Sequence, residues 1–246
     1  MQKTAFTNQV LNDIHEFLNQ NTKVFANERD LQMNLAVYLK CVKHHDVEVE
    51  YHVPSDILSS LVPQLPSERC TYYPWFQTNS DKPQEMYVDI VVSNGEEYVP
   101  IELKYKKKGL KGDVELFGQN MGMGIILKNN QAQDFGRYEF WKDVRRIELL
   151  VKSFEKVRNG IVLFVTNDVS YKMPLTQKNK NSVNLVMGDG TDTYHKNTNC
   201  CWPFNPLDTE SYKSCPCFYL EDEHDVNWNK HTFSGVDFHC AEVIVF

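Results

Sequence analysis

Apolar residues recur along this chain at two different periods, which divide it into predicted helices and strands. Residues 5–19 carry apolar side chains at helical spacing, and residues 28–44 do so more regularly. Asn27 stands where it can cap the second helix, with Asp30 favourably placed near the positive end of that helix. Residues 47–53 alternate between apolar and polar side chains, as a half-buried strand does. The pattern therefore predicts two helices followed by a strand.

Residues 88–109, VDIVVSNGEEYVPIELKYKKKG, predict a β-hairpin. Two apolar runs meet at Asn94-Gly95, a dipeptide typical of two-residue hairpin turns, and such a turn places Ile90 opposite Val99. Alternation then gathers the apolar side chains on one face. These are Val88, Ile90, Val92, Val99, Ile101 and Leu103.

The other face of this hairpin carries the charges. Asp89, Glu102 and Lys104 all fall on it, and the two-residue turn makes Asp89 and Glu102 diagonal neighbours. Because a slip of one residue would turn the charged set toward the core, the prediction depends on the register of the hairpin.

The next segments predict a connector, a long helix and a buried strand. The glycine-rich residues 118–124, GQNMGMG, lack the spacing of a phosphate-binding loop and predict a flexible connector. Residues 137–158 have the apolar stripe of the longest helix, which we expect to end at Gly160. Residues 161–166, IVLFVT, form a continuous apolar run typical of a strand that is covered on both faces.

The element order predicts an α/β fold. From residue 28 it is helix, strand, strand, strand, helix, strand, which makes residues 28–166 a core. Residues 167–246 are richer in polar and turn residues, and only 217–220 and 241–246 have the pattern of strands. We expect residues 1–246 to form a single domain, with 167–246 packed on the core as an elaboration.

Composition limits the possible classes of protein. With 246 residues, 41% of them hydrophobic and 24% charged, the chain is typical of a globular protein. The net charge of −7 argues against a protein coated in positive potential, although it allows a local basic site. No apolar run is long enough to span a membrane, and no signal peptide is evident at residue 1. We therefore expect a cytoplasmic protein, in which the seven cysteines are reduced thiols.

The charged face of the hairpin suits a particular chemistry. Two converging carboxylates are the ligands that Mg²⁺ prefers, and a neighbouring lysine can orient water or stabilise developing negative charge. Asp89, Glu102 and Lys104 therefore favour metal-assisted phosphodiester hydrolysis. The alternative is a solvated strand face with an incidental ion pair, and spacing alone does not decide between the two.

These residues resemble the motif of the PD-(D/E)XK nuclease superfamily, which has the restriction-endonuclease-like fold. Asp89 is followed thirteen residues later by Glu102-Leu103-Lys104. The predicted element order matches the αβββαβ core of that family, a central mixed sheet flanked by helices. Residues 128–148, KNNQAQDFGRYEFWKDVRRIE, resemble a segment of uncharacterised bacterial restriction-endonuclease-like proteins. One departure is Val88, where many members of the family have proline.

The resemblance implies a role for each matching residue. Asp89 and Glu102 would bind Mg²⁺, with Mn²⁺ able to substitute, and Lys104 would be the catalytic lysine. Glu28 would correspond to the catalytic glutamate of the first core helix, although an acid at this position also favours the helix N-terminus. Glu50 competes for the same acidic place, and Gln119 is a candidate for the glutamine that some members have after the lysine.

Basic residues close to this motif are candidates for nucleic-acid binding through phosphate contacts. They are Lys106, Lys107, Lys108, Arg137 and Lys142. Arg145 and Arg146 belong to the same basic stretch of the predicted long helix. A charged run on an amphipathic helix is also typical of a solvated face, so both interpretations stay open.

A cluster of cysteines and histidines near the C-terminus raises the question of zinc. It contains Cys200, Cys201, Cys215, Cys217, His195 and His224. Zinc sites commonly use paired C-x-x-C units, whereas the pairs here are C-C and C-P-C. The sequence does not decide between a zinc site and ordinary thiols.

The sequence as a whole predicts a Mg²⁺-dependent endonuclease that acts on nucleic acid, with DNA as the expected substrate. A homodimer is one arrangement that would suit double-strand cutting. One alternative is a catalytically silent relative that binds nucleic acid or a protein partner. Another is a metal-dependent enzyme with a different substrate.

Overall fold

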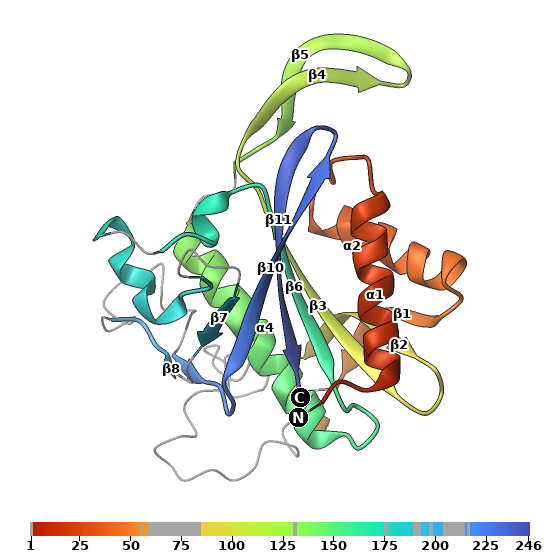
Figure 1. Cartoon of the computed structure of the whole chain (residues 1–246), viewed down its shortest axis with the longest axis vertical. Helices are drawn as coiled ribbons and strands as arrows, with labels where there is room; N and C mark the ends of the chain where they lie inside the picture. The colour runs from red at the N-terminus through yellow and green to blue at the C-terminus, as the bar shows by residue number, and fades with distance from the viewer. Residues whose placement is uncertain are drawn as a thin grey trace.

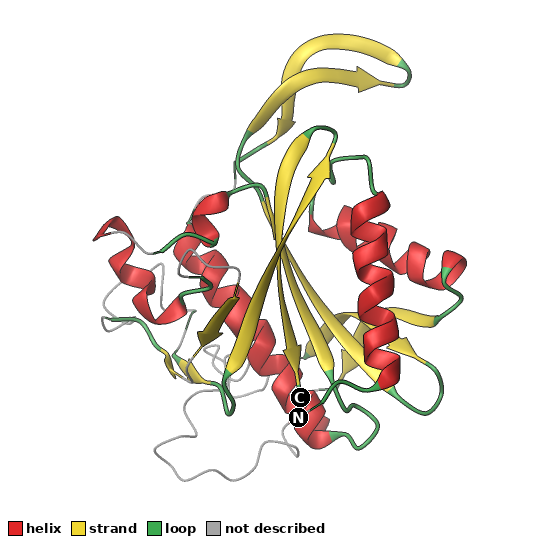
Figure 2. Ribbon diagram, in the orientation of Figure 1, coloured by secondary structure: helices red, strands yellow, loops and turns green. Residues whose placement is uncertain are grey.

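The computed structural model describes residues 2–54, 56–58, 85–129, 132–174, 177–188, 193–196, 199–203, 215 and 217–246. In these residues the chain forms an α/β fold, in which helices flank a seven-stranded mixed sheet (Figures 1 and 2). This confirms the predicted α/β class and the mixed central sheet.

The elements follow one another in a mixed order along the chain. The first half contains α1 (Ala5–Gln20), α2 (Glu28–Val37) with its π-helical continuation η1 (Tyr38–Val42), β1 (Asp46–Val53), β2 (Met86–Ser93), β3 (Tyr98–Lys106), β4 (Leu110–Leu116) and β5 (Gln119–Leu127). The second half contains α4 (Gln133–Ser153), β6 (Gly160–Thr166), η2 (Val169–Tyr171), η3 (Gln177–Leu185), β7 (Thr193–Lys196), β8 (Asn199–Cys200), β9 (Phe218–Tyr219), β10 (His224–Phe233) and β11 (Val236–Val245).

The main sheet has the strand order β1-β2-β3-β6-β11-β10-β7. Only β3 and β6 are parallel neighbours, and α4 lies in the connection between them. The order α2, β1, β2, β3, α4, β6 agrees with the predicted αβββαβ order, with the β4–β5 hairpin inserted before α4. The sheet separates two cores, because α1 and α2 cover one face and α4 covers the other (Figure 2).

The helices in the first half form where the sequence predicts them, whereas the bounds of the long helix differ. Asn27 caps α2 by accepting a hydrogen bond of 2.9 Å from the Asp30 amide. Helix α4 spans Gln133–Ser153, so the predicted range 137–158 is wrong at both ends. The backbone becomes extended at Phe154, and Gly160 instead begins β6. A side chain at Gly160 would collide with Ile147, so this glycine lets α4 lie close to the sheet.

Two further expectations about secondary structure are wrong. Residues 118–124 are no flexible connector, because β5 pairs with β4 in a hairpin that projects from the body (Figure 1). Strand β10 was not predicted. Two of its buried positions are occupied by His224 and His231 instead of apolar residues, so its sequence lacks the expected alternation of apolar and polar residues. Strand β6 is buried along its whole length, as predicted.

The C-terminal residues contribute strands to the main sheet itself. Strand β11 pairs with β6, and β10 and β7 extend the sheet beyond it. Most of the segment between residues 54 and 85 lies outside the described residues. None of the described helices is long and apolar enough to cross a membrane.

Candidate metal and phosphodiester site

The β2–β3 hairpin has a wider loop than the predicted two-residue turn. Ser93 pairs with Tyr98 and Ile90 with Ile101, so the predicted pairing of Ile90 with Val99 is wrong by two residues. The physical reason is the Asn94 side chain. Its Oδ1 accepts hydrogen bonds from the amides of Glu96 and Glu97, at 3.0 and 2.8 Å, and these bonds hold the wider loop. Glu102 and Lys104 are two residues apart on β3 and share a face whatever the pairing with β2 is.

The same shift brings Asp89 level with Glu102. The pairing between β2 and β3 ends at Ile90–Ile101, and Asp89 and Glu102 occupy the next position along each strand. The predicted diagonal relation is therefore replaced by a directly opposed one. Electrostatic repulsion between these two carboxylates contributes to the raised pKa of Glu102.

Strands β1 and β2 change face between the pairs Val49–Ile90 and Tyr51–Val88. The prediction that Val88 shares a face with Ile90 is therefore wrong. Ile90 packs in the core beneath α1 and α2, whereas Val88 packs in the core beneath α4. On β1, Glu50 lies between the pairs Val49–Ile90 and Tyr51–Val88, across from Asp89, and has a left-handed backbone with φ of 51°. A non-glycine residue in this conformation is strained, and such strain is often found at functional sites. The irregular position therefore coincides with the candidate carboxylates.

Beyond this point β3 presents backbone amides that two carboxylates satisfy. Asp89 Oδ2 accepts a hydrogen bond of 2.7 Å from the Leu103 amide, and Glu28 Oε2 accepts one of 2.8 Å from the Tyr105 amide. Both carboxylates thus accept hydrogen bonds from β3 amides that a neighbouring strand would otherwise accept. The sheet, rather than any local sequence pattern, brings Glu28 from the start of α2 to within 3.6 Å of the Lys104 ammonium.

Gln32 joins the site, and sequence reasoning did not identify it. Its amide nitrogen donates to the Asp89 carbonyl at 2.8 Å and to Glu50 Oε1 at 2.9 Å. Gln32 lies on α2, one helical turn after Glu28, and this i, i+4 spacing is the signal that could have found it. Its buried side chain ties α2 to β1 and β2 beside Asp89.

Helix α4 supplies two more members from the opposite side. Asp143 Oδ2 lies 2.9 Å from the Lys104 ammonium, and Arg146 lies 3.1 Å from Glu102 Oε1. Arg146 also lies 3.3 Å from Asp143 Oδ1. Sequence reasoning missed Asp143 and treated Arg146 only as part of a basic face. Their i, i+3 spacing, which places both side chains on one face of the helix, could have indicated that they act together.

The electrostatics of the site follow from its burial. Desolvation raises the pKa of Asp89 and raises that of Glu102 well above its usual range, although Lys104 and Arg146 act in the opposite direction. Burial also opposes the charge of Lys104, but the surrounding carboxylates, Asp143 first, outweigh it and raise the lysine pKa. Lys104 therefore remains a protonated ammonium at neutral pH.

Asp143 differs from the two hairpin carboxylates. Burial would raise its pKa, but the attraction of Lys104 and then of Arg146 outweighs burial and lowers the pKa. Asp143 is therefore the ionised partner of Lys104, while Asp89 and Glu102 lie where negative charge is poorly compensated.

The donor set can be compared with what a divalent cation requires. Among the described residues, no group of three or more histidine, cysteine, aspartate or glutamate side chains is arranged to hold a metal. Mg²⁺ often binds to proteins through only one or two carboxylates and retains several waters. Asp89 and Glu102 fit this smaller requirement, and buried Glu102 Oε1 has an ion-pair contact with Arg146 at 3.1 Å but accepts no hydrogen bond of good geometry from the described residues. Arg146 supplies the positive charge nearest to Glu102 in this arrangement.

The basic candidates for nucleic-acid binding separate into two groups. Arg137 is fully buried and donates to the Tyr171 and Ser170 carbonyls at 3.0 and 2.8 Å, so its predicted role in binding nucleic acid is wrong. Burial lowers the pKa of this guanidinium to about 10. Lys106 forms an ion pair with Glu139 and is partly neutralised.

The remaining basic candidates lie nearer to solvent. Lys108 is exposed at the end of β3, and Lys107 and Lys142 are half-buried. The positive charge of Lys142 helps to lower the pKa of Asp143, which places this lysine electrostatically beside the site. Arg145, by contrast, is held by Glu148 and Glu221 at 2.9 and 2.7 Å.

Gln119 and the cysteine cluster lie apart from this arrangement. Gln119 is exposed beside the tip of the projecting β4–β5 hairpin, rather than in the cluster around Lys104. The described cysteines form no disulfide bonds, and a hydrogen bond with Cys201 lowers the pKa of Cys217 to about 7. His224 contacts Glu148 at 2.8 Å, and the side chain of His195 lies outside what the structure describes.

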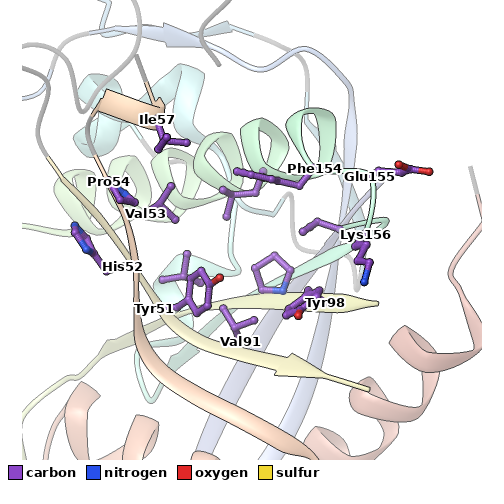
Figure 3. Close-up of a pocket in the computed structure, with 14 residues that line it drawn as sticks. Tyr51, His52, Val53, Pro54, Ile57, Val91, Tyr98, Phe154, Glu155 and Lys156 are labelled. Atoms are coloured by element: carbon purple, nitrogen blue, oxygen red, sulfur yellow. The ribbon is translucent and has the colours of Figure 1, made fainter. Parts of the chain in front are cut away.

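An apolar pocket of about 410 Å³ lies between the end of α4 and strands β1–β3. Figure 3 shows Tyr51, Val91 and Tyr98 from the sheet around it, with Phe154 from the end of α4. The polar residues at this pocket include Glu155 and Lys156, and none of the charged residues of the candidate site lines it. The pocket and the charged site are therefore different places on the α4 face.

Comparisons with known proteins do not assign this chain to a family. Neither a protein family model, nor a curated protein, nor a solved structure matches it.

Proposed function

We propose that this protein hydrolyses phosphodiester bonds in nucleic acid with the help of Mg²⁺, and that its substrate is DNA. The observation that carries the proposal is the convergence of Asp89 and Glu102 beside the Lys104 ammonium, at the place where the β2–β3 ladder ends. Two poorly compensated carboxylates next to a cation are suited to a divalent metal and a phosphate group.

The element order supports the same proposal. The order α2, β1, β2, β3, α4, β6, with Asp89 on the second strand and Glu102 and Lys104 on the third, is similar to the restriction-endonuclease-like core. Glu28 at the start of α2 and the parallel pair β3–β6 agree with this likeness. Because a fold hosts many functions, the charged residues carry the proposal and the likeness only adds to it.

Each side chain has a distinct role in the proposed reaction. A divalent ion held by Asp89 and Glu102 would polarise the phosphodiester and lower the pKa of the attacking water. Lys104 is protonated and is therefore suited to stabilising the negative charge that develops on the phosphoryl oxygens. Asp143 holds this ammonium in place from α4, so Asp143 is a positioning residue. Glu28 fixes the course of β3 through the Tyr105 amide and faces the same lysine.

Three lysines, of which Lys108 is exposed and Lys107 and Lys142 are half-buried, are the candidates for contact with nucleic acid. Lys107, Lys108 and Lys142 can neutralise phosphates without reading sequence, and the net charge of −7 makes such a local basic region the relevant one. Binding of this kind would weaken steeply as the salt concentration rises.

A second candidate is a catalytically silent module that binds nucleic acid or a protein partner. The pair of Arg146 with Glu102 favours it, because the guanidinium already supplies positive charge where the proposed ion would act. A metal-bound site would require Glu102 to exchange this partner.

Cleavage of supercoiled plasmid DNA tests the proposal. The purified protein is incubated with Mg²⁺ or Mn²⁺, with EDTA as the metal-free control, beside Asp89→Asn and the matched surface variant Asp237→Asn. We expect nicked or linear DNA only with metal, normal activity in Asp237→Asn, and a loss of at least about 100-fold in Asp89→Asn, the scale of losing an essential charge-stabilising group. A folded protein that binds DNA without cutting it would favour the silent module.

A further inference from the structure

The β4–β5 hairpin, called here the arm (Leu110–Leu127), has no counterpart in the proposed reaction. It projects from the body as a two-stranded ribbon (Figure 1), and its strands pack chiefly on each other. An isolated two-stranded hairpin is marginally stable in water, and further packing is normally needed to hold one. The arm therefore lacks the support that the other long strands receive from the main sheet.

One face of the arm is apolar and exposed. Met123 and Ile125 occupy alternate positions on β5, and their side chains are 74% and 60% exposed. On the opposite face the ribbon covers itself, because Ile126 lies over Gly112 and Val114 lies over Gly124. The exposed pair is thus set apart from the apolar residues that the arm covers by its own packing.

The tip of the arm extends this apolar surface. Phe117 and Gly118 form its turn, and both have positive φ, at 53° and 77°. Such a turn favours asparagine at the first position, whereas phenylalanine is strained there. Phe117 is fully exposed, and the neighbouring Leu116 is half-exposed. A strained and exposed aromatic residue gives no benefit to the isolated arm, but it is suited to contact with a partner.

The charges of the arm identify the kind of partner. Residues 112–124 contain Asp113 and Glu115 and no lysine or arginine, so the distal arm would repel the phosphates of a nucleic acid. On the exposed face, Lys111 pairs with Ile125 and Asp113 with Met123 in the register of the ribbon. One positive and one negative residue therefore flank the apolar pair on a single face. A patch of this kind is complementary to itself when a two-fold axis turns it round.

A dimer interface also requires a continuous apolar surface. A specific interface buries about 800 Å² on each partner, of which somewhat more than half is apolar. Apart from Ile126, which lies on the opposite face, the exposed apolar side chains of the arm are Leu116, Phe117, Met121, Met123 and Ile125. These side chains extend from the middle of the arm to its tip, so a contact centred on Met123 and Ile125 can continue to Phe117.

From these observations we infer that the arm is a homodimerisation element. Two copies of the chain pack their arms face to face about a two-fold axis, with Met123 and Ile125 at the centre and Lys111 against Asp113 of the partner subunit. This inference does not depend on the proposed function, because association needs neither metal nor nucleic acid.

Analytical ultracentrifugation of the full chain without nucleic acid tests the inference. We expect a reversible monomer–dimer equilibrium whose dissociation constant rises at least about tenfold in Met123→Asp, the effect of a central interface residue. Phe117→Asn is the sharper variant, because asparagine suits the turn and should preserve the arm while it weakens the dimer. The matched control is Val183→Asp, an exposed apolar position in η3, which should leave the equilibrium unchanged. Circular dichroism verifies that each variant is folded.

Charge exchange tests the proposed orientation. Lys111→Asp should weaken the dimer, and the addition of Asp113→Lys in the same chain should restore it, since the exchanged charges again oppose each other across the two-fold axis. A monomeric wild-type protein at all concentrations, or a dimer that Phe117→Asn and Met123→Asp leave unaffected, would overturn the inference. Loss of DNA binding in the arm variants of a monomeric protein would instead make the arm a nucleic-acid contact.

Discussion

The Lys104 ammonium on β3 lies 2.9 Å from Asp143 Oδ2 on α4; the Asp143 side chain is fully buried, and that of Lys104 is mostly buried. This pair joins the sheet that carries the candidate carboxylates to the helix that covers them. Because a buried charge without a partner is strongly unfavourable, each residue constrains how the other can be mutated.

We expect Lys104→Met to destabilise the protein by about 3 kcal/mol at pH 7, because Asp143 would lose its nearest counter-charge. Adding Asp143→Leu should recover most of this loss, since it removes the uncompensated carboxylate. Urea unfolding of both single variants and the double variant measures the coupling. Purely additive effects would show that the pair does not contribute as a unit. The exposed pair Lys230–Asp237 is the control, and Lys230→Met should change stability little.

This coupling affects how activity is interpreted. Loss of cleavage in Lys104→Met alone could arise from a weakened fold. Comparison with the double variant separates the two causes, because the double variant should regain stability without regaining the ammonium. Cleavage by the stable double variant would exclude Lys104 from the proposed mechanism.

We expect Asp89→Asn to stabilise the metal-free protein by on the order of 1 kcal/mol at pH 7. Burial raises the pKa of Asp89, so its ionised form is less favourable in the folded state than in the unfolded state. This disadvantage is present at neutral pH and disappears below the unfolded-state pKa, where both states are protonated. Asparagine retains an oxygen to accept from the Leu103 amide. Denaturant unfolding at pH 7 and near pH 3, with EDTA present, measures the difference.

Asp237→Asn is the control for this prediction. The hydrogen bond from Lys230 lowers the pKa of Asp237, so loss of its charge should fail to stabilise the protein at pH 7. Equal effects of the two substitutions, or a destabilised Asp89→Asn, would mean that burial does not govern the carboxylate in the site.

We expect the affinity for Mg²⁺ to increase as the pH rises through the raised pKa values of Asp89 and Glu102. Both carboxylates must be deprotonated to bind a cation, so binding should release protons. Titration calorimetry in two buffers with different ionisation enthalpies measures this release. Binding without proton release, or with the same affinity across the pH range, would place the ion elsewhere. The Asp89→Asn variant should bind the ion at least about tenfold more weakly, a loss of about 1.4 kcal/mol.

We expect Arg146→Met to make the protein less stable in EDTA and more responsive to Mg²⁺. Glu102 would lose its partner 3.1 Å away, at a cost of about 3 kcal/mol, and a divalent ion could then supply the missing positive charge. Thermal unfolding with and without Mg²⁺ should show a larger metal-induced rise in melting temperature than in the wild type. An equal or smaller rise would mean that Arg146 does not compete with the ion for Glu102.

The candidate site was only partly predictable from local pattern. The common face of Glu102 and Lys104 followed from the alternation of one strand, so the error of two residues in the pairing with β2 did not affect it. The turn itself was mispredicted, since the Asn94 side chain holds a loop that the Asn94-Gly95 dipeptide does not reveal. The prediction for the face of Val88 was wrong because strands β1 and β2 both change face beside Glu50 and Asp89.

The basic residues of α4 show more clearly what a local sequence pattern fails to predict. Arg137 and Lys142 are both basic residues of the same amphipathic helix. Arg137 is nevertheless buried against backbone carbonyls, whereas Lys142 is half-buried. No local period distinguishes them, because the carbonyls that receive the guanidinium belong to Ser170 and Tyr171, far along the chain.

The sequence by itself determined the existence of α1, α2 and α4, the buried strand β6 and the segregation of charge on β3, because each depends on a period repeated within a few residues. Only the tertiary structure decided that Gln32, Asp143 and Arg146 belong to the site, and that the C-terminal strands complete the main sheet. The physical reason is that buried charges and unpaired amides are satisfied by whichever groups the packed chain brings close. Those partners come from distant segments whose separation in sequence carries no periodic signal.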